Sequence, residues 1–399
     1  MKARSGFQFR NPGLLAVIWI LGGMACSFPE KPGSDAKLHP AATSVRALPA
    51  ESDPAAEFGK ASEREGEWEE AVRAARQEGK LVLCGPPGET WRRTLLTFEQ
   101  DFPGIRVEYT GLNSRDFWPR MFRERELGQF LWDLRVGGPD PQVYEARDKA
   151  ALDPIRPLLL LPEVVDEGKW LGGVEALFVD KEKKYIAGFL SYASSVVYVN
   201  RDVISYAEFR SDKDLTDPRW KGKIVLQDPR GGSGLGSMAV LLAVQGEQFV
   251  RDLLTKQDVV VTSDIRQQAE WVVRGRYPIG IGVLPDQLLD LKEQGLNFNV
   301  RRLKEGSAGL SVGFGGLQLI NRSPHAGAAR VFLNWVLTQK TQSRLTQALK
   351  LNSRRLDVPP GDPEVLVDPS EGRNYIPHQS EEYLYLRQRG AELAAQLLK

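Results

Sequence analysis

The feature that most constrains the fold of this sequence is a repeated order of apolar run, glycine-bearing loop and amphipathic segment. Residues 80–84, 105–109 and 131–136 are short apolar runs, and the segments between them have helix-like spacing. Strands and helices that alternate in this way favour a parallel sheet covered by helices. Ligands of such sheets bind at the loops beyond the carboxyl ends of the strands. The sequence therefore predicts an α/β fold with a site among these loops.

A second set of strand-helix units follows after residue 186. The predicted strands are 196–200, 223–226, 259–261 and 277–282. The run at 223–226 leads into a glycine-rich loop and then into an apolar helix at 237–244. A last set starts at 317 and ends near 355. The length of the chain, 399 residues, suggests about two domains.

The N-terminus has the pattern of a secretion signal that ends at a lipidated cysteine. Basic residues precede an apolar run at 14–21, which is short for a bilayer span of about 20 residues. Small residues then lead to Cys26, a position typical of a lipobox, although Gly23 stands where Leu is usual. The alternatives are an ordinary cleaved signal and an uncleaved anchor. Each of them places residues 27–399 outside the cytoplasm, in the cell envelope.

Cysteine content and composition limit the rest of the chain. The sequence has two cysteines, so a lipidated Cys26 leaves Cys84 without a disulfide partner. Cys84 ends an apolar run, and we interpret it as a small buried hydrophobic residue rather than a nucleophile. Residues 27–65 are rich in Pro, Ala, Ser and charge, which is typical of a flexible tether. A net charge of +1 gives no electrostatic basis for binding nucleic acid.

Four segments carry a family resemblance. They are residues 68–82, 215–224, 266–279 and 325–335. Together they resemble type 2 periplasmic solute-binding proteins, specifically the ferric-iron and thiamine-like branch of ABC importers. The resemblance implies a periplasmic-binding-protein-like II fold, with two α/β lobes, a cleft and crossover hinge strands.

The resemblance also implies a domain arrangement. Residues 1–26 are the signal and 27–65 the tether. Lobe one is expected at 66–190 and 305–358, and lobe two at 191–304. Residues 359–399 form a C-terminal tail with a helix from about Glu381.

The loops of lobe one contain the first candidate ligand residues. Gly85, Pro86 and Thr90 follow the first apolar run, and Asn113 and Ser114 follow the second. The alternative for Thr90, Asn113 and Ser114 is that they cap the next helix. In the predicted crossover, Tyr192 can either line the cleft or pack between the lobes.

The loops of lobe two contain the second candidate set. Arg230, Gly232 and Ser233 precede a helix, where free amides, the helix dipole, a hydroxyl and a guanidinium can hold an anion. The loop is neither a Walker loop nor GxGxxG. The alternative is a glycine turn with Arg230 in a salt bridge. Asp264 and Arg266 are further candidates, although helix capping also explains Asp264.

Metal binding and catalysis are both disfavoured. Ferric-binding members of the family carry adjacent tyrosines after the strand corresponding to 279–282, whereas this chain has Val-Leu-Pro-Asp-Gln at 283–287 and no Tyr-Tyr pair. The three histidines, His39, His325 and His378, are too dispersed for a zinc site. No GxSxG motif occurs, and the histidines are badly placed for a nucleophile pair. We therefore expect no metal, no cofactor and no enzyme activity.

The resemblance thus predicts a monomeric lipoprotein on the periplasmic or extracellular face of a membrane. It would capture a small polar solute, with anions among the candidates, and deliver it to an ABC permease and its ATPase. The alternative is a ligand-sensing or adaptor lipoprotein on the same fold. Neither interpretation involves nucleic acid.

The Cys26→Ser variant should lose lipid attachment and release the folded body in soluble form, because the thiol is the predicted acylation site. Metabolic labelling with palmitate, followed by membrane fractionation, measures this. The matched control is Cys84→Ser, which should stay labelled. A wild-type protein that never takes up palmitate would contradict the lipoprotein interpretation.

Overall fold

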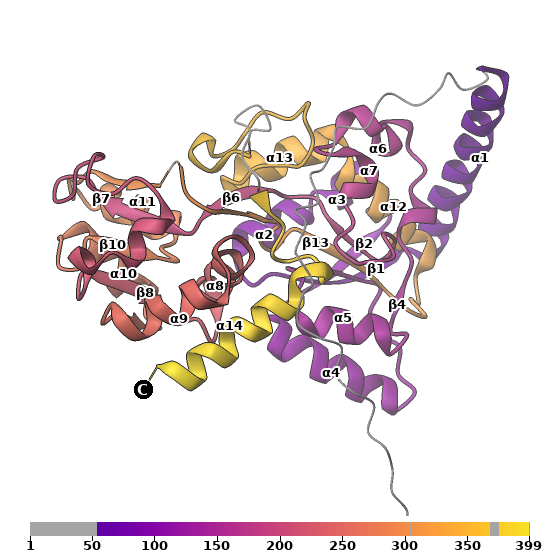
Figure 1. The fold of residues 1–399 in the computed structure, drawn as a ribbon. Helices are drawn as coiled ribbons and strands as arrows, with labels where there is room; N and C mark the ends of the chain where they lie inside the picture. The colour runs from indigo at the N-terminus through magenta and orange to yellow at the C-terminus, as the bar shows by residue number, and fades with distance from the viewer. Residues whose placement is uncertain (1–53, 304, 368–374, 399) are drawn as a thin grey trace, which may run out of the picture. The chain divides into compact units, whose positions relative to one another are not determined.

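A computed structural model describes residues 54–303, 305–367 and 375–398 (Figure 1). The signal segment, Cys26 and its predicted lipid, and His39 lie outside the described residues. Helix α1 spans Pro54–Glu78, so it begins within the segment expected to be a tether. Its first turns are rich in Ala, Glu and Lys, which have high intrinsic helix propensity. None of the described helices is long and apolar enough to cross a membrane.

The first sheet has the order β2-β1-β3-β13-β4, and β5 also pairs with β13. Strand β1 runs parallel to β2 and β3, as the sequence predicted, whereas β13 is antiparallel to β3, β4 and β5. The chain therefore returns to this sheet after it has built the second one. The strands are β1 (Lys80–Gly85), β2 (Arg106–Gly111), β3 (Leu134–Val136), β4 (Leu152–Asp153), β5 (Ile186–Gly188) and β13 (Gly316–Ile320).

Helices on this sheet bury an aromatic cluster. Phe98 lies with its ring centroid 5.2 Å from that of Phe332 and 5.2 Å from that of Trp335, and all three side chains are buried. The helices are α2 (Glu89–Leu95), α3 (Phe98–Asp101), α4 (Ser114–Glu126), α5 (Pro141–Asp148), α6 (Pro162–Val165), α7 (Gly173–Ala176), α12 (Ala326–Leu337) and α13 (Gln339–Leu349). The short 3-10 turns in lobe one are η1 (Arg156–Leu158) and η2 (Glu167–Lys169).

The second sheet has the order β11-β7-β10-β8-β9. Strand β8 is parallel to β9 and β10, while β7 is antiparallel to β10 and β11. The strands are β7 (Val197–Asn200), β8 (Ile224–Gln227), β9 (Val260–Thr262), β10 (Ile279–Ile281) and β11 (Val300–Arg302). The helices are α8 (Gly232–Gln245), α9 (Glu247–Lys256), α10 (Ile265–Val273) and α11 (Pro285–Glu293), with 3-10 turns η3 (Asp212–Thr216) and η4 (Pro218–Trp220).

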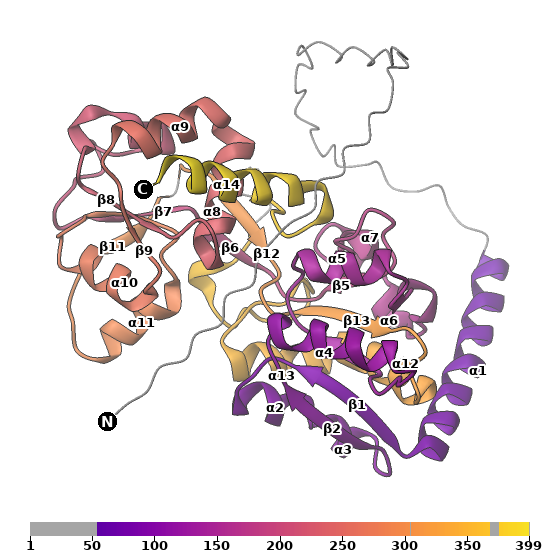
Figure 2. The same cartoon turned by 90° about the horizontal axis from the view of Figure 1, so that it is seen from below.

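A third, small sheet connects the first two (Figure 2). Strand β6 (Tyr192–Ser195) leads from β5 to β7, and β12 (Ala308–Ser311) leads from β11 back to β13. The two strands pair antiparallel over their whole length. They are the crossover strands that the resemblance implied, and they divide the described chain into two α/β lobes.

The C-terminal tail adds a third connection between the lobes. Strand β14 (Tyr375–Ile376) pairs parallel with β12, after the 3-10 turn η5 (Pro363–Val365). On lobe one, the Tyr144 hydroxyl donates to the Gln379 carbonyl (2.6 Å), and Arg147 pairs with Glu381. Turn η7 (Glu381–Tyr383) then leads into α14 (Leu384–Leu397), which packs on α8 and α9 of lobe two. The C-terminal tail therefore contacts both lobes, and its helix α14 packs on lobe two.

Asp101 joins three helices of lobe one. Its carboxylate accepts hydrogen bonds from Trp335 on α12 (2.9 Å) and from Lys340 (2.8 Å) and Arg344 (2.5 Å) on α13. Burial alone would raise the pKa of Asp101, but these hydrogen bonds outweigh it and hold the pKa well below the ordinary value of 3.8. The ionised carboxylate is thus the form that the folded state stabilises.

The Asp101→Asn variant should lower the free energy of unfolding at neutral pH by about 1.5–3 kcal/mol, the scale of a charged hydrogen bond. Because the pKa of Asp101 is lower in the folded than in the unfolded state, its carboxylate stabilises the fold at pH values above the unfolded-state pKa. The difference from wild type should therefore shrink as the pH falls below 3.8. Urea unfolding at several pH values measures it. Asp290→Asn, on the exposed surface of α11, is the control and should change stability by no more than about 0.5 kcal/mol.

Candidate functional site

The loops after β1 and β2 lie side by side at one edge of the first sheet. The amide of Leu112 donates to the Gly85 carbonyl (3.0 Å), and a Cβ on Gly111 would lie 3.2 Å from the Pro87 Cα. The two loops of lobe one that the sequence analysis selected therefore lie together, and their contact with a ligand stays a prediction. Their exposed parts are Pro87, Gly88 and Glu89 in one loop and Asn113 in the other.

Gly85 and Pro86 have structural roles in this edge. A Cβ on Gly85 would lie 2.4 Å from the Tyr109 hydroxyl, so only glycine fits there. The Tyr109 hydroxyl donates to the Pro86 carbonyl (2.5 Å), which occupies that oxygen, and Pro86 itself is buried. Thr90 is half-buried in the first turn of α2, whose N-cap residue is Gly88. The N-cap role considered for Thr90 therefore belongs to Gly88.

Asn113 and Ser114 stand at the start of α4. Asn113 is the N-cap residue by backbone geometry, but its side chain makes no capping hydrogen bond. Ser114 is half-buried, and its hydroxyl oxygen accepts a hydrogen bond from Nη2 of Arg135 (2.6 Å). The side-chain capping alternative is therefore not observed at Asn113.

Arg135, on β3, is a buried residue that the sequence interpretation missed. Its side chain is 2% exposed, its Nη1 donates to Gln318 (2.9 Å), and its Nε has no partner. Its guanidinium also lies over the rings of Phe117 and Trp118. Desolvation lowers the pKa of Arg135, and its side-chain hydrogen bonds in the described chain go to the neutral groups of Gln318 and Ser114. An apolar run with one arginine at 131–136 was the signal that could have identified it.

Arg354 is a second buried cation without a counter-charge. It is 5% exposed, and its guanidinium makes no hydrogen bond or ion pair with any described residue. Desolvation lowers its pKa to about 10. Its amide donates to the Phe189 carbonyl (2.9 Å), close to the start of the crossover at β6. Lobe one therefore has uncompensated positive charge near the site edge and near the crossover.

The strand ends of the second sheet converge in the same way. Ser233 donates its hydroxyl to the Gly282 carbonyl (2.7 Å), which ties the loop after β8 to the loop after β10. The amide of Asp228 donates to the Thr262 carbonyl (2.9 Å) at the end of β9. Gly232 is the first residue of α8, whose N-cap, Gly231, makes no side-chain capping bond. The three loops of lobe two therefore form one polar edge.

Arg230 is exposed and already has a partner. Its Nε and Nη2 donate to the two carboxylate oxygens of Asp228 at 2.8 Å each. These hydrogen bonds raise the pKa of Arg230 and lower that of Asp228. The salt bridge considered as the alternative is therefore present, and ligand contact by Arg230 stays a prediction.

The remaining lobe-two candidates make local contacts. Asp264 caps α10, because its carboxylate accepts from the Gln267 amide (3.0 Å). Arg266 donates to Glu270 (3.1 Å) and to Gln294 (2.9 Å) on the exposed side of α10. These contacts match the capping alternative, and no contact to a ligand is needed to explain either residue.

Tyr192 is half-buried at the start of β6, as expected for a residue in the crossover. Its ring lies against Gly313, where an added Cβ would be 2.9 Å from Cε1. Both the cleft-lining and the packing interpretation are compatible with this position.

Within the described residues, no group of three or more His, Cys, Asp or Glu side chains could hold a metal ion. His325 contacts Asp133 (2.8 Å), and His378 is buried beside Ser194 (3.4 Å). Burial lowers the pKa of His378 to about 3, with a smaller contribution from Arg387. Burial also raises the pKa of the Cys84 thiol to about 11, so it stays protonated and unreactive at neutral pH.

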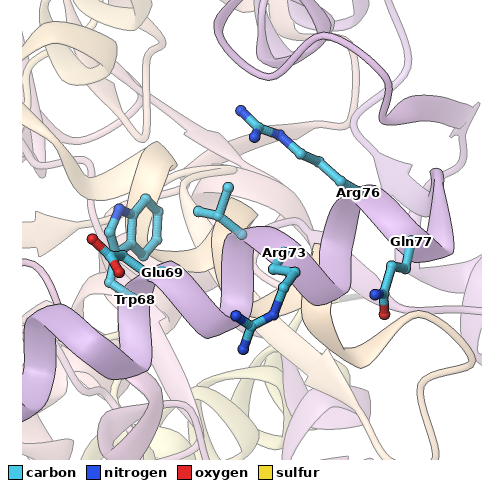
Figure 3. A pocket seen from close by; sticks show the side chains of 6 residues that line it. Trp68, Glu69, Arg73, Arg76 and Gln77 are labelled. Atoms are coloured by element: carbon cyan, nitrogen blue, oxygen red, sulfur yellow. The ribbon is translucent and has the colours of Figure 1, made fainter.

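A hollow of about 570 Å³ lies along α1 (Figure 3). It is lined by Trp68, Glu69, Val72, Arg73, Arg76 and Gln77. All of these residues belong to one helix, and none belongs to the strand-end loops. We therefore place the candidate site at the loops, where groups from several strands converge.

No protein-family profile matches the chain. A Haemophilus influenzae protein described as uncharacterized is 28% identical over 135 residues, which are 33% of this chain and 38% of that protein. The match thus spans well under half of either protein.

Solved structures of periplasmic binding proteins share the fold. Iron-bound HitA from Pseudomonas aeruginosa has a TM-score of 0.60 and 17% identity, and the match covers 80% of this chain and 99% of HitA. The Bordetella ferric binding protein has a TM-score of 0.60 and 18% identity, with 80% and 98% covered. Trichodesmium IdiA (FutA), in complex with iron and citrate, has a TM-score of 0.62 and 15% identity, with 80% and 99% covered.

Identities this low establish the architecture alone. The chain has the two-lobed type II fold of periplasmic binding proteins, so the fold class and the resemblance inferred from sequence are confirmed at the level of the fold.

The Arg230→Ala variant should weaken binding of an anionic solute by roughly 1.5–3 kcal/mol, since a charged hydrogen bond is lost. Stability should change little, because the pair with Asp228 is exposed. Calorimetry and urea unfolding measure the two effects. Arg219→Ala is a matched control, because Arg219 makes the same kind of pair with Asp217, outside the strand-end loops. Unchanged affinity in Arg230→Ala would remove Arg230 from the site.

Proposed function

We propose that the protein is a solute-binding lipoprotein that captures a small polar solute between its lobes and delivers it to an ABC importer. The observation that carries this proposal is the convergence of glycine-bearing strand-end loops at both sheets, in a chain whose lobes are joined by paired crossover strands. Free amides at the ends of such loops suit polar ligands. The fold shared with periplasmic binding proteins supports the same role.

The solute we propose is anionic. Arg135 and Arg354 are buried, and the side-chain hydrogen bonds of Arg135 in the described chain go to neutral groups. Buried charges cost several kcal/mol unless a counter-charge is supplied. The glycine-bearing start of α8 adds further donors on lobe two. A solute with a carboxylate or phosphate would meet positive groups on lobe one and amides on lobe two. No catalytic step is proposed.

We propose that the lobes close over the solute by rotation about β6 and β12. Closure would bring residues 85–90 of lobe one towards residues 230–234 of lobe two. A ligand can shift this equilibrium only by its greater affinity for the closed form. The predicted lipid at Cys26 would keep the protein on the periplasmic or extracellular face of a membrane, near a permease and its ATPase, as a monomer.

Iron is not the solute in this proposal, although several proteins with the same fold bind it. After β10 the chain runs through Gly282, Val283 and Leu284 into α11, with no tyrosine pair. Phenolate oxygens are hard ligands suited to ferric iron, and aliphatic side chains cannot replace them.

A thermal-shift screen of metals, polyamines, sugars, organic acids and phospho-compounds tests the function. At least one anionic solute should raise the melting temperature, because a ligand stabilises the folded state that it binds. Small-angle scattering should then show a smaller radius of gyration with that solute. A red-brown complex with ferric citrate would contradict the exclusion of iron, and turnover of a bound solute would contradict the absence of catalysis.

A further inference from the structure

We propose that the N-terminus of α4, together with the guanidinium of Arg135, binds an oxyanion of the solute, either a carboxylate or a phosphate. This inference rests on the proposed solute-binding function and specifies the chemical group that lobe one recognises. It also assigns a binding role to Arg135.

The start of α4 has donors that nothing in the described chain satisfies. The helix has 13 residues, and the Asn113 side chain makes no capping bond. The amides of Ser114 and Arg115 make no hydrogen bond with any described residue, whereas those of Asp116 and Phe117 bond to the Asn113 carbonyl. Unpaired amides at the positive end of a helix dipole are typical anion donors.

Arg135 points its guanidinium at this helix start. Its Nη2 donates to the Ser114 hydroxyl oxygen at 2.6 Å, and its Nη1 is held by Gln318 at 2.9 Å. Gln318 is fully buried and is itself fixed by its bond to the Gly137 carbonyl (3.2 Å). The guanidinium is therefore rigidly oriented towards the first turn of α4, and its Nε remains without a partner.

Within the described residues no carboxylate pairs with this charge, because the side-chain hydrogen bonds of Arg135 go to Gln318 and Ser114. Asp140 is the nearby acid, and its Oδ1 accepts the amides of Gln142 and Val143 at the start of α5. The Cys84 thiol stays neutral, because burial raises its pKa. A buried charge is normally paired, so a bound oxyanion would supply the missing partner.

Ser114 connects the two parts of the site. Its oxygen accepts from Arg135, so its own proton is free to donate to an anion. Its side chain is half-buried, which leaves it reachable from solvent. The first turn also contains the exposed Asp116, whose charge opposes an anion, and the exposed Arg115, which offsets it. The net charge at the helix start is therefore positive, because Arg115 offsets Asp116 and Arg135 adds a further positive charge.

The test uses the matched variants Ser114→Asp and Ser114→Asn in the full folded body, with inorganic phosphate and succinate as probes. The wild type should be stabilised by at least one probe, and the probe that acts identifies the group as phosphate or carboxylate. Ser114→Asp places a fixed carboxylate beside Arg135. It should raise the melting temperature without any probe and weaken binding of the active probe by at least about tenfold. Ser114→Asn, which adds no charge, should lack the first effect.

Calorimetry measures the affinity for the probe, and thermal melts measure the melting temperature. Ala326→Asp introduces the same charge at the exposed start of α12, outside the strand-end loops of the candidate site, and should leave probe affinity unchanged. The proposal is overturned if neither probe stabilises the wild type, or if Ser114→Asp binds the probe as well as the wild type does. It is also overturned if Ala326→Asp weakens probe binding as strongly as Ser114→Asp does. If a solute from the thermal-shift screen binds the wild type and Ser114→Asp equally well, the protein binds solutes but not through this site. Probe binding without a decrease in the radius of gyration would instead count against capture of the solute between the lobes.

Discussion

The antiparallel pairing of β6 with β12 is the interaction on which the architecture depends. Ser195 pairs with Ala308 and Tyr192 with Ser311, so two chain segments far apart in sequence are joined at the boundary between the sheets. Backbone hydrogen bonds hold this register independently of the side chains. The pairing therefore sets where the chain leaves one sheet and enters the other. Strand β14 pairs with β12 and is the third strand of the same small sheet. The positions of the binding groups in both lobes therefore depend on the pairing of these two short strands.

The periodicity of the sequence predicted most strands but not the order in which they pair in the sheets. Residues 80–84 and 223–226 became β1 and β8, because short apolar runs between glycine-bearing loops have few alternatives. No local pattern shows that Gly316–Ile320 lies between β3 and β4, since that pairing bridges a long stretch of chain. The family resemblance supplied the return of the chain to the first lobe, but not this pairing.

The candidate site was predicted as a set of loops more successfully than as a set of side chains. Glycines and helix starts are visible in sequence, so the edges at Gly85, Ser114 and Ser233 were found. The partners of polar side chains are not visible there. Arg230 and Asp264 proved to make local contacts with Asp228 and the Gln267 amide, whereas Arg135 stood inside an apolar run and drew no attention. Its significance lies in what it lacks, a carboxylate in the described chain, and only three-dimensional contacts reveal that.

The position of β13 in the middle of the first sheet has a consequence for the order of folding. Strands β1, β2 and β3 precede the whole of lobe two in the chain, but β4 and β5 pair in this sheet through β13. The first lobe therefore exposes an unpaired edge of β3 until the chain beyond residue 316 arrives. The second sheet is continuous in sequence from β7 to β11 and has no such dependence. A chain that folds from its N-terminus would thus complete its second lobe before its first, and the exposed edge of β3 is where it needs protection from aggregation.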